Sequence, residues 1–234
     1  MKYLFFAIFF PFFMNCQKIQ DKQMNIELKN ELAQIDKDDQ IYRELMLPET
    51  SPERRKEIIK EKNLSQEDAT VGLGKIMNQQ DAENLAKIEK IIAQYGYPGK
   101  SLVGEPENKT AWLIIQHSPK INQYMPLIKK AAEEKELPYR LYAMMLDRQL
   151  VQEEKEQIYG TQARSFKTIK DGKTEIVWII WPIKDFKNVN ALREEVGFGQ
   201  TLEDYAQGLL GKDFVFKNYT LEEALQLQNK IKSK

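Results

Sequence analysis

Apolar residues at helical spacing run through most of this chain, and only one later stretch has the pattern of β-structure. In the first helical segment they recur at steps of three and four from Leu28 to Met46, which places them on one face of an α-helix. The later stretch holds two β-rich runs separated by Asp171-Gly172, a pair that predicts a hairpin. We therefore expect an α+β fold: a mostly α-helical single domain with one β-hairpin at about residues 158–181.

The second strand of this hairpin is expected to be covered on both faces. Every residue from Ile176 to Trp181 is apolar, so apolar side chains alternate onto the two sides of the strand. Continuous apolar runs of this kind are typical of strands that are buried on both faces.

The first 15 residues indicate export. Lys2 is their only charge, and residues 3–13 are almost wholly apolar, as in a secretory signal peptide. This stretch is much shorter than the roughly 20 residues that a membrane-spanning helix needs. A buried N-terminal helix is the alternative, but polar residues begin abruptly at Gln17.

Cys16 follows the apolar stretch directly, and the segment resembles a bacterial lipoprotein signal, in which such a cysteine is acylated. The residues before it, Phe13, Met14 and Asn15, depart from the usual lipoprotein pattern. The resemblance implies that residues 16–25 are a lipid anchor and tether and that the partner is a membrane, bound through acylated Cys16. Gln17 stands where an inner-membrane retention signal has Asp, which favours an outer-membrane lipoprotein facing the periplasm or the cell surface.

The remaining chain, residues 26–234, has the length and composition of one domain without disulfides. Cys16 is the only cysteine, so a hydrophobic core must stabilise the domain. Acidic and basic residues number 35 each, which argues against a nucleic acid as partner. Residues 48–79 are rich in charged and polar side chains and indicate a variable insertion.

Several charged or polar residues fall where the helical pattern calls for apolar ones. Asp39 lies on the apolar stripe of its helix, with Arg43 four residues further on. His117, the only histidine, ends the most hydrophobic helix, and Asp147 and Arg148 interrupt another apolar run. Charges at core-facing positions are costly unless they are paired, so we expect these helices to meet around a shared polar pocket.

Three of these residues are candidates for catalysis. His117 beside a carboxylate such as Asp147 suits a general base, and Arg148 suits two-pronged binding of an anion. The alternatives stay open: His117 as a hydrogen-bonded core residue and Asp39 with Arg43 as a structural ion pair. Asp147 and Arg148 are adjacent, so each needs a different partner.

No cofactor or metal is expected. The glycines near Val71 lack the spacing of a phosphate-binding loop, and no Gly-x-Ser-x-Gly motif is present. One histidine without a usable cysteine argues against zinc. A carboxylate pair for glycoside hydrolysis stays open, since many Asp and Glu residues are available.

A set of short motifs extends along the chain in order. They are Asp39-Gln40 with Arg43, Tyr95-Gly96 with Pro98, Val103-Gly104, Gln116-His117, Asp147-Arg148, Gln157-x-Tyr159-Gly160-Thr161-Gln162, Pro182-Ile183 with Asp185, and Arg193 before Gly197. In these the chain resembles a bacterial family of unknown function found in lipoproteins and other exported proteins. That family has no assigned reaction, substrate or cofactor.

The resemblance adds candidates for ligand binding. Together with the burial argument these are Asp39, Arg43, Gln116, Tyr159, Thr161 and Gln162. The Tyr159–Gln162 stretch is equally interpreted as a corner that defines the fold.

Two functions follow from these observations, and whether the chain is an enzyme stays open. The first is an envelope protein whose polar site binds a small ligand or a protein partner. The second is an envelope hydrolase with His117 as general base. A structural element of a membrane complex is a third possibility, which would need an exposed apolar patch.

Overall fold

The computed structural model describes residues 24–170 and 173–232. Within them it is a mostly helical α+β single domain with one antiparallel hairpin, which confirms the predicted fold class. The export segment and Cys16 lie outside the described residues. The N-terminal part contains α1 (Ile26–Glu44), α2 (Pro52–Glu61), α3 (Leu73–Tyr95), α4 (Lys100–Val103), η1 (Glu107–Lys109), α5 (Thr110–Gln116), α6 (Ile121–Glu133) and α7 (Tyr139–Gln152). The C-terminal part contains β1 (Ala163–Lys170), β2 (Lys173–Ile180), η2 (Phe186–Asn188), α8 (Val189–Glu195), α9 (Leu202–Leu210) and α10 (Leu221–Lys232).

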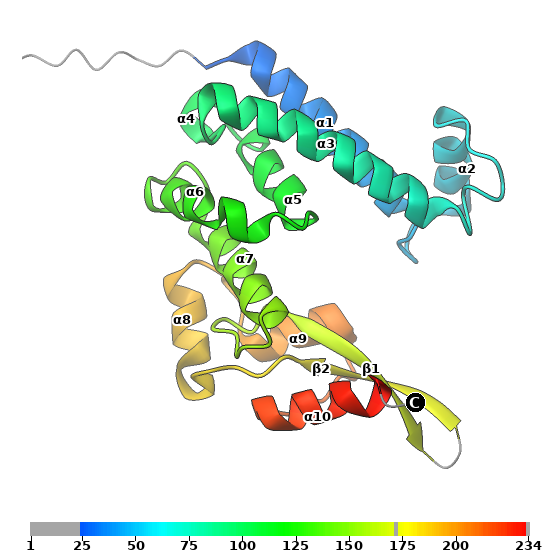
Figure 1. Ribbon diagram of the computed structural model, residues 1–234, viewed down its shortest axis with the longest axis vertical. Helices are drawn as coiled ribbons and strands as arrows, with labels where there is room; N and C mark the ends of the chain where they lie inside the picture. Colours follow the sequence, from blue (N-terminus) through cyan, green and yellow to red (C-terminus); the bar gives the residue numbers. More distant parts are fainter. Residues whose placement is uncertain (1–23, 171–172, 233–234) are drawn as a thin grey trace, which may run out of the picture.

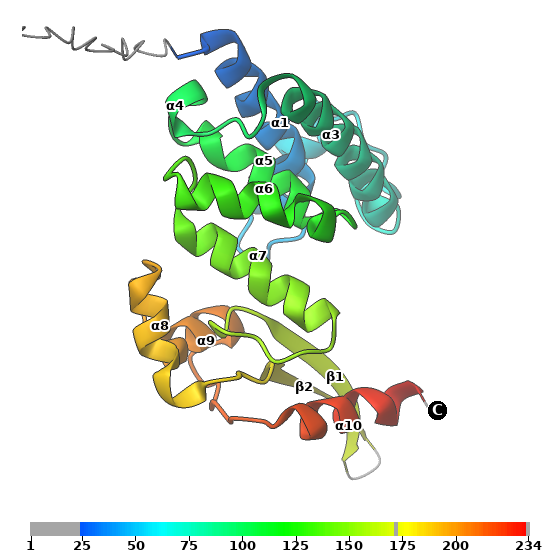
Figure 2. The ribbon, with the colours of Figure 1, turned by 60° about the vertical axis from the view of Figure 1, so that its left-hand side comes forward.

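Helix α7 lies between two regions of the molecule (Figures 1 and 2). On one side α1, α3, α5 and α6 form a helical bundle in which α1 packs against α3 and α5. On the other side the hairpin lies with α8, α9 and α10, and α10 packs against β1. The two regions therefore share one helix, which belongs to the packing of both.

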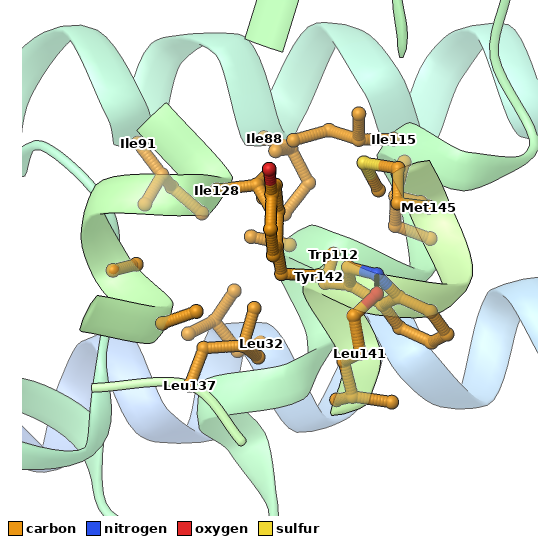
Figure 3. Close-up of a cluster of buried hydrophobic side chains, with 14 of the residues drawn as sticks. Leu32, Ile88, Ile91, Trp112, Ile115, Ile128, Leu137, Leu141, Tyr142 and Met145 are labelled. Atoms are coloured by element: carbon orange, nitrogen blue, oxygen red, sulfur yellow. Dashed lines mark hydrogen bonds between the residues drawn. The ribbon is translucent and has the colours of Figure 1, made fainter. Parts of the chain in front are cut away.

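The main core fills the helical bundle. Helix α5 is apolar nearly all round, and its residues Ala111, Trp112, Ile114 and Ile115 are buried, as expected of a central helix. Figure 3 shows side chains from α1, α3, α5, α6 and α7 meeting around Trp112 and Tyr142. Burial of each large apolar side chain contributes about 1.5–3 kcal/mol. The indole Nε1 of Trp112 donates a hydrogen bond of 2.8 Å to the carbonyl of Leu141, which satisfies its buried polar group.

The hairpin starts later than its sequence pattern indicates. Its register pairs Ala163 with Ile180 and Lys170 with Lys173, so β1 begins at Ala163 and not near Ile158. Residues 158–162 form a loop instead, because side chains from elsewhere bind their main-chain groups. The expected Asp171-Gly172 turn lies outside the described residues.

The expectation that both faces of β2 are covered is wrong for its outer part. Ile179 and Ile180 are buried, but Ile176 is 62% exposed and Trp178 50% exposed. Helix α10 covers the face that carries Phe166 and Ile179, whereas on the opposite face Ile176 and Trp178 keep half or more of their surface exposed. The continuous apolar run in the sequence does not distinguish the buried inner end of β2 from its exposed outer part.

The segment 48–79 contains α2 and the beginning of α3. Ser51 caps α2, since its Oγ accepts a hydrogen bond of 3.1 Å from the N–H of Arg54, and Pro52 occupies the first turn. Ile58 of α2 packs in a small separate cluster with Ile41 of α1. Helix α1 itself ends at Glu44, so Met46, expected on its apolar face, is exposed.

Candidate functional site

A cleft of about 460 Å³ opens beside Arg148. Helix α7, the start of β1, strand β2 and helix α9 form its walls, and its lining residues are Met144, Arg148, Thr161, Gln162, Ala163, Trp178, Tyr205, Leu209 and Leu210. Three residues predicted for a site, Arg148, Thr161 and Gln162, therefore lie together in one cleft.

Asp147 holds the loop that forms one edge of this cleft. Its buried carboxylate accepts main-chain hydrogen bonds from Ile158 at 2.8 Å, Tyr159 at 3.1 Å and Thr161 at 3.0 Å. It also accepts a hydrogen bond of 2.9 Å from the Thr161 hydroxyl. Burial raises the pKa of the Asp147 carboxyl, and these hydrogen bonds oppose the rise. The contacts give Asp147 a positioning function for the 158–161 loop.

Two further buried polar side chains complete this loop. The amide of Gln157 accepts a hydrogen bond of 2.9 Å from the Gln162 N–H and donates to the Gln162 and Trp181 carbonyls. Arg193, wholly buried, donates 2.8 Å to the Tyr159 carbonyl. Together with Asp147 and with the Tyr205 hydroxyl, which donates to the Thr161 carbonyl, side chains from four places in the chain bind the backbone of this loop.

Gly160 is required by the shape of the loop. Its φ of +71° is unfavourable for residues with a side chain, and a Cβ there would collide with Leu202 and Ile183. Tyr159 packs its ring on Phe198 and does not belong to the lining of the cleft. Burial raises the pKa of Tyr159 to about 12. In the Tyr-Gly-Thr-Gln stretch, Tyr159 and Gly160 thus form a corner, and Thr161 and Gln162 form part of the cleft wall.

Arg148 is the cation of the cleft. Its Nη1 donates a hydrogen bond of 3.0 Å to the main-chain carbonyl of Gln116, and its side chain is half-buried. Burial lowers the pKa of this guanidinium, and no carboxylate among the described residues forms an ion pair with it. Gln116, a candidate for ligand binding, contributes its main-chain carbonyl to this contact.

A second polar cluster lies at the helical bundle. The buried carboxylate of Asp39 accepts hydrogen bonds from Arg43 at 3.0 Å and from the Gln40 amide at 2.6 Å. Arg43 also binds Asp81 of α3 with two hydrogen bonds of 2.9 Å. His117 Nδ1 is 3.5 Å from Asp39 Oδ1 and is buried without a hydrogen-bond partner among the described residues.

The predicted shared pocket thus becomes two neighbouring clusters. His117 pairs with Asp39, whereas Asp147 binds the 158–161 loop. The two clusters approach each other at the end of α5, where Arg148 binds the carbonyl of Gln116 and His117 is the next residue. In the described ranges 24–170 and 173–232, no group of three or more His, Cys, Asp or Glu side chains is placed to hold a metal ion.

Three residues of these clusters were not expected from the sequence. Asp81 lies in a polar stretch of α3, where an additional acidic residue does not stand out as a candidate for a buried ion pair. Tyr205 and Trp178 follow ordinary apolar patterns, and their position at the cleft arises only when α9 and the hairpin pack beside α7.

Comparison with known proteins identifies a family. A model of a family of unknown function, DUF6624, matches residues 37–217. This range includes both polar clusters and the cleft. No curated protein and no solved structure matches the chain. The chain belongs to this family of unknown function.

Proposed function

We propose that this chain is an exported, lipid-anchored envelope protein that binds a small anionic ligand in the cleft beside Arg148. The observation that carries the proposal is the half-buried guanidinium of Arg148, which lines the cleft without a carboxylate partner among the described residues. A partly desolvated charge without a counter-charge is costly, and an anion in the cleft would remove that cost.

The chemistry of the cleft suits such a ligand. A guanidinium has five N–H donors in a planar fork that matches a carboxylate or a phosphate. Arg148 uses Nη1 on the Gln116 carbonyl, which holds the guanidinium in place and leaves its other donors without a protein partner among the described residues. The volume of about 460 Å³ lies within the range of roughly 300–1,000 Å³ that is typical of small-molecule sites.

Export and anchoring are supported by Lys2, the apolar residues 3–13 and Cys16. The helices of the described chain include none with the length and apolar character to span a bilayer. The test is labelling with radioactive palmitate. Label that enters the wild-type protein and not Cys16→Ser supports acylation, and equal labelling of the two contradicts it.

Anion binding is tested by titrating the full chain, carrying Cys16→Ser, with butyrate and with butylammonium. Trp112 and Trp181 are buried, so a change in tryptophan fluorescence reports mainly on Trp178 in the cleft wall. Butyrate is expected to change the fluorescence, and butylammonium is not.

The matched variants for this titration lie on the same helix. Arg148→Gln should abolish the response to butyrate, whereas Arg140→Gln, at an exposed position of α7, should retain it. An unchanged response in Arg148→Gln would show that this guanidinium does not bind the anion.

One observation favours a second function, hydrolysis with His117 as general base. Nδ1 is buried and faces Asp39, so the 22% exposure of the side chain comes from other ring atoms. A histidine ring nitrogen next to a buried carboxylate is a feature of many catalytic bases, and here the two atoms are 3.5 Å apart without a hydrogen bond between them. We favour ligand binding because no nucleophile motif is present in the sequence and His117 does not line the cleft.

The hydrolase is tested with p-nitrophenyl butyrate. If His117 is a catalytic base, His117→Gln should lower the rate of ester hydrolysis by roughly 100-fold or more. A rate equal to that of the wild-type protein would refute the hydrolase function for this substrate class.

A further inference from the structure

The structure also indicates what kind of anion fits the cleft. Resting on the proposed function, we infer that the ligand is a free medium-chain fatty acid. Its carboxylate binds Arg148, and its acyl chain lies along Met144, Trp178 and Leu209.

The polar groups of the cleft leave one main place for a charged head group. The Tyr205 hydroxyl donates 2.9 Å to the Thr161 carbonyl, and the Thr161 hydroxyl donates to Asp147. The side-chain amide of Gln162 donates 3.1 Å to the Thr161 hydroxyl oxygen. The hydroxyl donors and one amide N–H of these residues are thus engaged within the protein, and Arg148 offers the only charged donor of the cleft lining among the described residues. A sugar or a peptide, with many polar groups, would find few partners here.

The rest of the lining is apolar and unusually open to solvent. Trp178 and Leu209 are each 50% exposed, although both are large hydrophobic residues, and both line this one cleft. Ile176, 62% exposed, lies on the same face of β2 as Trp178 and extends the apolar strip outward. Grouped exposed apolar side chains commonly mark a binding surface, because covering them removes apolar area from water.

The volume of the cleft limits the length of the acyl chain. At about 30 Å³ for each water-sized group, 460 Å³ accommodates about 15 non-hydrogen atoms. This is close to the size of dodecanoate. A longer acid would extend past the cleft onto the exposed part of the hairpin.

The test is calorimetric titration of the full chain, carrying Cys16→Ser, with butyrate, octanoate and dodecanoate below their micelle concentrations. Affinity should rise by up to about fourfold for each added CH₂ from butyrate to dodecanoate, the acid that nearly fills the cleft. Dodecylammonium, which has the same tail and the opposite charge, should bind much more weakly.

The outcomes separate this inference from the proposed function. Equal affinity for butyrate and dodecanoate would overturn the fatty-acid inference and leave anion binding intact. Equal binding of dodecanoate and dodecylammonium, or dodecanoate binding that is unchanged in Arg148→Gln, would overturn the anion site itself.

A pair of surface variants tests the position of the tail. Leu209→Asn should weaken dodecanoate binding by roughly tenfold, because Leu209 lines the cleft where the acyl chain is placed. Val215→Asn, at an 85% exposed apolar position outside the cleft, should not change this affinity. Both leucine and valine positions are exposed, so folding should survive, which circular dichroism checks. Full dodecanoate affinity in Leu209→Asn would contradict the placement of the acyl chain.

Discussion

Replacing Asp147 with alanine would leave four donor groups of one loop without their shared acceptor. They are the main-chain N–H groups of Ile158, Tyr159 and Thr161 and the hydroxyl of Thr161. Water can reach the half-buried Ile158 and Tyr159, but Thr161 is only 3% exposed, so its two donors stay unsatisfied. Each of the two unsatisfied Thr161 groups costs about 1–3 kcal/mol, and the N–H groups of Ile158 and Tyr159 add a smaller cost. We therefore expect the free energy of unfolding to fall by about 3–5 kcal/mol.

The measurement is equilibrium unfolding in urea, followed by circular dichroism. Glu194→Ala removes an exposed carboxylate on α8 and should change the free energy of unfolding by less than about 0.5 kcal/mol. Thr161→Val removes the hydroxyl that Asp147→Ala leaves without an acceptor. The double variant should therefore lose less free energy of unfolding than the two single variants lose together. A loss below about 1 kcal/mol in Asp147→Ala would refute the reasoning, because it would mean that the loop does not depend on this carboxylate.

Three other changes are expected to alter stability, each measured by the same unfolding experiment. Gly160→Ala should cost about 2 kcal/mol or more, because φ is positive and the added Cβ meets Leu202; a neutral effect would contradict the loop geometry. Ile128→Ala should cost about 2–5 kcal/mol through the cavity left in the main core, and a loss under 1 kcal/mol would mean that the site collapses freely. The hydrogen bond from Lys120 lowers the pKa of Glu89 below its ordinary 4.5, so this stabilisation is present above that pH and is lost as the pH falls through the lowered value. Glu89→Gln should therefore cost up to about 1 kcal/mol at neutral pH and nothing in strong acid, and a loss independent of pH would refute the assignment.

The fold was predictable where the local pattern determines burial. The apolar run of α5 required a central helix, and Asp171-Gly172 between β-rich runs required a hairpin. The extent of the hairpin was not predictable, because its start depends on a carboxylate from α7 that binds the loop before β1. The exposure of Ile176 and Trp178 was not predictable either, since it depends on which helices reach the outer part of the sheet.

The sequence predicted which polar residues of the candidate site are buried better than it predicted which partners they contact. Burial logic selected Asp39 and Asp147, and both are almost fully buried with polar partners. The partners themselves come from distant elements: Asp81 lies 38 residues after Arg43. No local spacing encodes such a contact, because it arises from the packing of α1 against α3.

Because Asp147 and Arg148 are adjacent in α7, the rotation of this one helix determines the positions of both the 158–161 loop and the cleft cation. Each residue advances an α-helix by about 100°, so one side chain meets the 158–161 loop while the next meets the cleft. Inserting or deleting a single residue in α7 ahead of this pair would rotate both at once and displace the loop anchor and the cleft cation together. The stretch between Pro138 and Asp147 should therefore accept changes of side chain much more readily than changes of length.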